Sequence, residues 1–134
     1  MSDASAKSRL TTPQVCGWAM TGLVGAFLAF DGVIKLLVIP PVVDAFQGIG
    51  FPVSLARGMG VLEVAILVLY LTPRTAVLGA ILLTGLLGGA VASHLRLLDP
   101  LFSHILSGVY VGALAWGGLY LRDERLRRLL PLRA

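Results

Sequence analysis

Long apolar runs alternate along this chain with short stretches that contain proline or charge. Four runs are long enough to cross a bilayer as helices, because a hydrocarbon core of about 30 Å requires roughly 20 apolar residues. They cover residues 15–39, 53–72, 75–95 and 101–121. Prolines mark the breaks between them, since proline lacks an N–H group and clashes with the preceding turn. The pattern predicts an all-α integral membrane four-helix bundle with a short interfacial segment, helical over 42–47, between spans one and two.

The composition favours a membrane protein over a water-soluble one. Of 134 residues, 57% are hydrophobic and 13% are charged, and the mean hydropathy is +0.88, whereas a soluble domain has about 25% charged residues. The lone Cys16 excludes an intramolecular disulfide. The first run is too long for a signal-peptide core and no A-x-A site follows it, so we expect a retained span. The expected organisation is a polar tail at 1–12, one four-span domain at 13–121 and a basic tail at 122–134.

Lysine and arginine gather on one side of the predicted bundle. With four spans, that side carries Lys7, Arg9, Arg74, Arg122, Arg125, Arg127, Arg128 and Arg133. The other side holds Arg96, with Arg57 near a span end. Cytoplasmic segments are enriched in these residues, so both termini are predicted to be cytoplasmic. The basic tail suits membrane lipid rather than nucleic acid, and it is either an amphipathic segment resting on anionic headgroups or a topology determinant alone.

Ionisable residues inside the spans concentrate in one half of the membrane. They are Asp31, Lys35, Arg57, Glu63, His94 and His104. At 1.5 Å per residue, Lys35 lies about 6 Å and Asp31 about 12 Å from the outer end of span one, and Glu63 lies about 15 Å deep in span two. Arg57 and the two histidines lie nearer the outer ends of their spans. This placement predicts a polar site that opens toward the non-cytoplasmic face.

The cost of burying charge indicates that these side chains lie between helices. A charge at the centre of a span costs about 2.5–3.5 kcal/mol on insertion scales. Asp31 and Lys35 are i,i+4 neighbours and can pair within one helix. Glu63 is expected to face span one or three. Arg57 is expected either to form an ion pair with Asp31 or to lie near the membrane interface. The network either fixes helix packing only or forms a functional site, and intramembrane charges favour the second interpretation.

The candidate roles follow from the residue types. Glu63, Asp31 and Lys35 are the candidate catalytic residues, with the acids handling protons and the lysine polarising a carbonyl oxygen. Arg57, His94 and His104 are candidate ligand-binding residues. Two histidines with a carboxylate would suit a metal in ligand type, but no H-x-x-x-H or E-x-x-H spacing exists, so no metal site is predicted. Flavin, haem, iron–sulfur and nucleotide motifs are absent from the sequence.

Small residues spaced four apart predict where helices approach closely. Gly85-x-x-x-Gly89 and Gly108-x-x-x-Gly112 have this spacing, and Gly17 begins a similar series in span one. Such faces let helix backbones come together in a lipid environment, where the hydrophobic drive for association is lost. They predict a bundle and give no information on chemistry.

Four short motifs give the chain a family resemblance. They are FDGVIKL at 30–36, FQGIGFP at 46–52, GVLE at 60–63 and GAVASHLR at 89–96. In order and spacing the chain resembles the DoxX-like family of small four-span bacterial membrane proteins. The resemblance implies that Lys35, Glu63 and His94 are family-type polar positions, with Gly32, Gly48 and Pro52 shaping the backbone. Asp31 departs from the small polar residue expected before that glycine.

The resemblance implies a multi-pass protein of the bacterial cytoplasmic (inner) membrane. Some family members look like subunits of quinone-linked or stress-related membrane oxidoreductases. The first expectation is therefore a subunit that binds a quinone or another lipophilic ligand beside a partner oxidoreductase subunit, with a homo-oligomer as a further arrangement. A second is a stand-alone membrane enzyme in which Asp31 and Glu63 catalyse isomerisation or ring-opening of a lipophilic substrate. A third is a non-enzymatic scaffold, chaperone or transport accessory.

Overall fold

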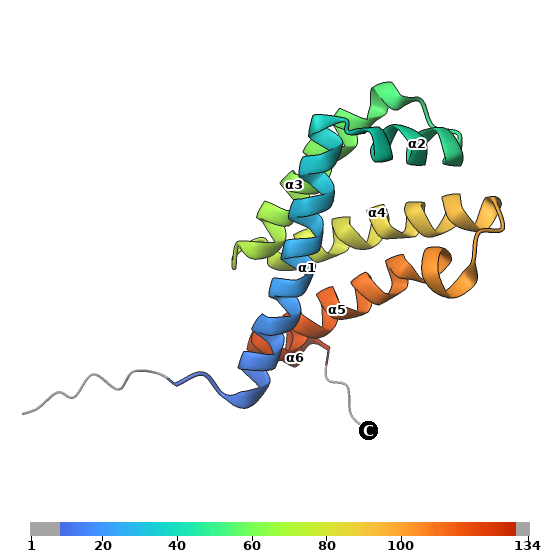
Figure 1. Ribbon diagram of the computed structural model, residues 1–134. Helices are drawn as coiled ribbons and strands as arrows, with labels where there is room; N and C mark the ends of the chain where they lie inside the picture. Colours follow the sequence, from blue (N-terminus) through green and yellow to red (C-terminus); the bar gives the residue numbers. More distant parts are fainter. Residues whose placement is uncertain (1–8, 131–134) are drawn as a thin grey trace, which may run out of the picture.

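The computed structural model describes residues 9–130, and every regular element in that range is helical (Figure 1). The elements are α1 (Thr12–Leu37), α2 (Pro40–Ile49), the 3₁₀ turn η1 (Val53–Leu55), α3 (Ala56–Leu71), α4 (Ala76–Arg96), the π-helical turn η2 (Leu101–Ile105), α5 (Ser107–Arg122) and α6 (Glu124–Leu129). Residues 1–8 of the expected N-terminal tail and 131–134 of the expected C-terminal tail lie outside the described residues.

Four helices are long and apolar enough to cross a membrane, which confirms the predicted spans. They run over Thr12–Leu37, Val53–Leu71, Ala76–Arg96 and Leu101–Arg122, within three residues of the expected boundaries. The segment between the first two spans is also helical, and α2 is longer than the one or two turns expected. Pro40 and Pro41 lie in its first turn, where the missing N–H groups would have no helical partner in any case.

The four spans converge at one end and separate at the other. Helix α1 packs against α3 and α5, and α4 packs against the same two helices. In Figure 1, α4 and α5 run side by side away from α1 and α3, while α2 extends from the end of α1 in the same general direction, above the far part of α4. We call the end where α1 begins and α5 ends the closed end. The opposite end, which contains α2, η1 and η2, is the open end.

The main apolar core fills the closed end. It includes Val24, Leu28, Ile66, Leu67, Tyr70, Ala76, Ala80, Leu83, Ala115, Leu119 and Leu126. Tyr70 is fully buried there, and its hydroxyl donates to the carbonyl of Ala115 at 2.6 Å. A buried tyrosine hydroxyl needs such a partner. This end therefore holds all four spans together through apolar packing, and a buried hydrogen bond joins α3 to α5.

Glycines allow close contact between α3 and α4 and between α4 and α5, but not at every glycine of α4. A Cβ atom on Gly79 would lie 2.4 Å from the Tyr70 nitrogen, so α3 and α4 meet there at the smallest separation that glycine permits. Gly108 likewise lies against Leu87 and Val91. Gly85 and Gly89 have nothing within 4 Å of an added Cβ. The prediction that these two form a packing face is therefore wrong within the described residues, because both line a cavity and face open space and no neighbouring helix.

Candidate functional site

A cavity of about 810 Å³ occupies the open end of the bundle. Its walls come from α1, α2, α3, α4, η2 and α5. Much of the lining is apolar and includes Phe27, Leu28, Phe46, Phe51 and Met59. The cavity exists because α4 and α5 lean away from α1 and α3, and Gly85 and Gly89 on its wall leave the space unfilled.

A lysine between two carboxylates forms the polar wall of this cavity. Lys35 Nζ donates to Asp31 Oδ2 at 2.7 Å, across one turn of α1, and also to Glu63 Oε1 on α3. The exposed fractions of the three side chains are 15% for Lys35, 30% for Asp31 and 4% for Glu63. Glu63 is therefore the deepest member, and Lys35 joins α1 to α3. This geometry satisfies the expectation that Glu63 faces span one.

Two glycines explain why Lys35 reaches Glu63. Gly32 and Gly60 face each other where α1 crosses α3, and a Cβ on Gly60 would lie 2.8 Å from the Gly32 carbonyl oxygen. Gly32 lies three residues before Lys35, and Gly60 lies three before Glu63. Residues at this spacing share a helix face. Because α1 and α3 run antiparallel, Lys35 and Glu63 lie on opposite sides of the glycine crossing. The close approach of the two helices there lets the Lys35 side chain reach across it to Glu63.

The second oxygen of Glu63 has no partner. Oε2 is buried and makes no hydrogen bond to any of the described residues. Leaving a buried polar atom unsatisfied costs about 1–3 kcal/mol, and more for a charged group. With all three groups ionised, the cluster carries one positive and two negative charges. A proton bound at this oxygen would remove the excess negative charge of the cluster. A hydrogen-bond donor from a bound molecule would give the oxygen the partner that it lacks.

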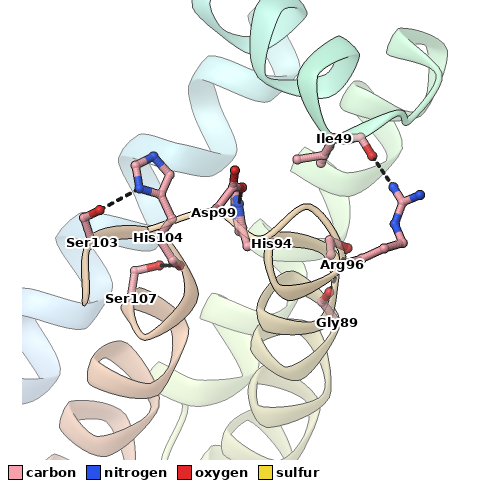
Figure 2. Close-up of polar contacts among 9 residues, drawn as sticks. Ile49, Gly89, His94, Arg96, Asp99, Ser103, His104 and Ser107 are labelled. Atoms are coloured by element: carbon pink, nitrogen blue, oxygen red, sulfur yellow. Dashed lines mark hydrogen bonds and ion pairs between the residues drawn. The ribbon is translucent and has the colours of Figure 1, made fainter. Parts of the chain in front are cut away.

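Two histidines lie at the rim of the same cavity (Figure 2). His94 donates its Nδ1 hydrogen to Asp99 Oδ2, with 2.6 Å between these atoms. The His94 and His104 rings meet edge to face, with centroids 5.7 Å apart. The Ser103 hydroxyl lies 2.7 Å from His104 Nδ1. A carboxylate bonded to Nδ1 fixes the ring orientation and leaves Nε2 as the group that can exchange a proton.

Asp99 is the cavity residue that the sequence analysis missed. The Asp99-Pro100 pair indicated only a turn, whereas the carboxylate folds back onto His94. The backbone makes this return through Leu98, which has a left-handed φ of 55°, and the Asp99 N–H donates to the His94 carbonyl at 3.2 Å. A non-glycine residue in that conformation is uncommon. Nothing in the five-residue spacing from His94 to Asp99 indicated this contact.

The structure does not bring Arg57 to the site. Its side chain is exposed, forms no ion pair within residues 9–130 and does not line the cavity. Arg57 therefore does not pair with Asp31. Arg96 makes the contact across the open end instead: its Nη2 donates to the Ile49 carbonyl at the end of α2, at 2.7 Å (Figure 2). Within the described range, no three His, Cys, Asp or Glu side chains gather closely enough to hold a metal ion.

The placement of the other predicted residues agrees with a single site. Asp31, Lys35, Glu63, His94 and His104 all line the one cavity. Comparison with curated proteins and with solved structures gave no significant match. The model of the DoxX-like family matches residues 19–118, which contain the second and third spans in full, most of the first and fourth, and every one of these side chains. This chain is a membrane protein that belongs to the DoxX-like family.

Proposed function

We propose that the protein binds a lipophilic molecule with a small polar head, of the quinone and quinol class, in the open-end cavity and serves a membrane oxidoreductase. The observation that carries the proposal is the unpaired, buried Oε2 of Glu63 beside a cavity of about 810 Å³. Ligand pockets typically measure about 300–1,000 Å³ and combine an apolar lining with a few polar groups. This cavity has both properties.

The polar groups fit the hydrogen bonds that such a head requires. A lysine ammonium has three donors, and Asp31 and Glu63 occupy two of those on Lys35. The third can donate to a carbonyl oxygen. Glu63 Oε2 can accept from a hydroxyl, and His94, held by Asp99, can exchange a proton with the same head. The apolar side chains that line the cavity would cover the tail.

A bound quinone would supply two-electron chemistry coupled to two protons. The residues of this chain would bind and orient the head, hold a proton at the Asp31–Lys35–Glu63 cluster and exchange one at His94. The electrons would come from a partner oxidoreductase subunit. The lysine and arginine asymmetry supports an inner-membrane orientation with both termini in the cytoplasm, which would place the cavity in the outer half of the bilayer.

A cluster that only fixes helix packing is the competing interpretation. The ion pair between Lys35 and Glu63 fits that role, because it joins α1 to α3, while the pair with Asp31 lies within α1. A packing cluster gains nothing from an unpaired carboxylate oxygen or from a cavity beside it, since buried networks stabilise a fold when every member is satisfied. These two features support the ligand site.

Ligand binding can be measured directly. The protein would be purified in a mild detergent, its extract analysed for quinones by mass spectrometry, and the Kd for a short-chain ubiquinone and a short-chain menaquinone determined by titration. We expect Glu63→Gln to weaken binding at least tenfold. Asp44→Asn is the matched control, because Asp44 is an exposed acid on α2 outside the cavity. Equal affinities for wild type and Glu63→Gln would reject the site.

A further inference from the structure

A second pocket, of about 510 Å³, lies at the closed end, at the opposite end of the spans from the proposed ligand site. The start of α1, the turn between α3 and α4, and the junction of α5 with α6 form its walls. Its lining residues are Trp18, Pro73, Arg74, Ala76, Arg122, Asp123, Glu124 and Arg125. Three guanidinium groups from different parts of the chain thus meet in one pocket.

The arrangement of these arginines is built into the fold. Arg122 Nη2 donates to the Tyr70 carbonyl at 3.1 Å, and its Cζ lies 4.6 Å from the centre of the Trp18 ring. The chain then turns at Asp123, whose Oδ1 accepts from the Arg125 N–H at 2.9 Å. Leu126, only 3% exposed, packs into the closed-end core. Helix α6 is therefore anchored, and Arg125 returns to the side of Arg122.

The two acids at this pocket, Asp123 and Glu124, offset only part of the charge of its three arginines. One oxygen of the Asp123 carboxylate accepts the backbone N–H of Arg125. Glu124 pairs with Arg127, at 3.9 Å, and Arg127 does not line the pocket. Within residues 9–130, Arg74 and Arg125 form no ion pair. Two guanidinium groups thus remain available to an anion in a pocket that a third, fixed arginine also lines.

We propose that this pocket binds the phosphate of an anionic phospholipid headgroup. The planar fork of arginine matches phosphate oxygens, and two or more arginines bind one phosphate well. The pocket lies where the spans end, at the depth of headgroups, beside the half-exposed Trp18, a residue type typical of the membrane interface. A soluble phosphate would offer the same chemistry, but the pocket's position at the span ends favours lipid.

The test compares lipids on protein that has been stripped of lipid in detergent. Native mass spectrometry would count bound phosphatidylglycerol and phosphatidylcholine over a concentration series, and inorganic phosphate would be added as a competitor. We expect phosphatidylglycerol to bind more tightly than phosphatidylcholine. Arg74→Gln/Arg125→Gln should weaken that binding about 30-fold, equivalent to about 2 kcal/mol at 1.4 kcal/mol per tenfold change. Inorganic phosphate at millimolar concentration should displace little of it.

Arg128→Gln is the matched control, because Arg128 is an exposed arginine of α6 that does not line the pocket. We expect its affinity to stay within about twofold of wild type, since a surface charge outside the site contributes little. Equal binding of the two lipids, an unchanged affinity in the double variant, or binding of inorganic phosphate in place of lipid would each overturn the proposal. None of these readouts depends on quinone binding at the open end.

Discussion

Lys35 is the only base that contacts either acid of the open-end cluster among the described residues, so its removal tests the cluster most directly. Methionine keeps an unbranched apolar chain of similar length and removes the charge. Lys35→Met leaves Asp31 and Glu63 without their common partner. The two acids should respond differently, because 30% of the Asp31 side chain is exposed and only 4% of the Glu63 side chain is.

The exposed fraction of each acid determines how much free energy of unfolding is lost at that acid when Lys35 is removed. Removing one partner of a buried ion pair costs about 3–5 kcal/mol, because the other charge stays buried. That range applies to Glu63. The Asp31–Lys35 pair is less buried, since 30% of the Asp31 side chain is exposed at the cavity wall, and an i,i+4 pair on a helix contributes only about 0.3–0.5 kcal/mol. We therefore expect Lys35→Met to lower the free energy of unfolding by about 3–5 kcal/mol, with nearly all of the loss arising at Glu63.

A double-mutant comparison separates the two acids. Lys35→Met/Glu63→Gln should recover most of the lost free energy of unfolding, and Lys35→Met/Asp31→Asn should recover about 0.5 kcal/mol or less. The measurement is reversible unfolding by SDS titration in mixed micelles, with Asp44→Asn as an exposed control. A larger recovery from Asp31→Asn, or a loss below about 1 kcal/mol for Lys35→Met, would refute the assignment of Glu63 as the main partner.

Three further predictions concern topology, the rim and the helix crossings. In a cysteine-free background, a cysteine at position 44 should react with an impermeant thiol reagent only from the non-cytoplasmic side; labelling from the cytoplasm would reverse the orientation. Asp99→Asn keeps the shape but loses the charge that holds His94, so ligand affinity should fall about tenfold, as expected for a charge-assisted bond of about 1.5 kcal/mol, with stability little changed. Gly79→Ala should lower the free energy of unfolding by at least about 1–3 kcal/mol through overpacking. Gly85→Ala should be neutral or stabilising by about 0.5–1 kcal/mol, and equal effects of the two would show that α3 and α4 do not cross as described.

Much of the fold was predictable because the membrane imposes simple rules on the sequence. A span must be apolar and about 20 residues long, and prolines mark where it stops. The boundaries predicted from these rules differ from the helices by three residues at most. The grouping of Asp31, Lys35 and Glu63 was likewise accessible, since depth along each helix follows from residue counting.

Counting residues along a helix gives the depth of a side chain in the membrane. It gives neither the direction of that side chain around the helix nor the path of the loop that follows. Depth left Arg57 either paired with Asp31 or near the interface, and in the structure it lies on an exposed face of α3, away from the cavity. Asp99 was assigned to a turn because the turn's direction depends on one left-handed residue, Leu98, that no propensity rule indicates. Side-chain direction around a helix and the path of a short loop are tertiary properties. They decided which of the predicted polar residues share the cavity.

The distribution of close glycine contacts explains how one small bundle can hold both a rigid end and a cavity. At Gly79 the backbones of α3 and α4 touch, and at Gly32 and Gly60 those of α1 and α3 do. These crossings fix α3 between its two neighbours. Beyond them, a Cβ added to Gly85 or Gly89 would have no atom within 4 Å, and both residues line the open-end cavity. A side chain larger than glycine at these two positions would fill part of the space that we propose for the ligand. We therefore attribute opposite roles to the same residue type, with close packing at the crossings and open volume on the cavity wall.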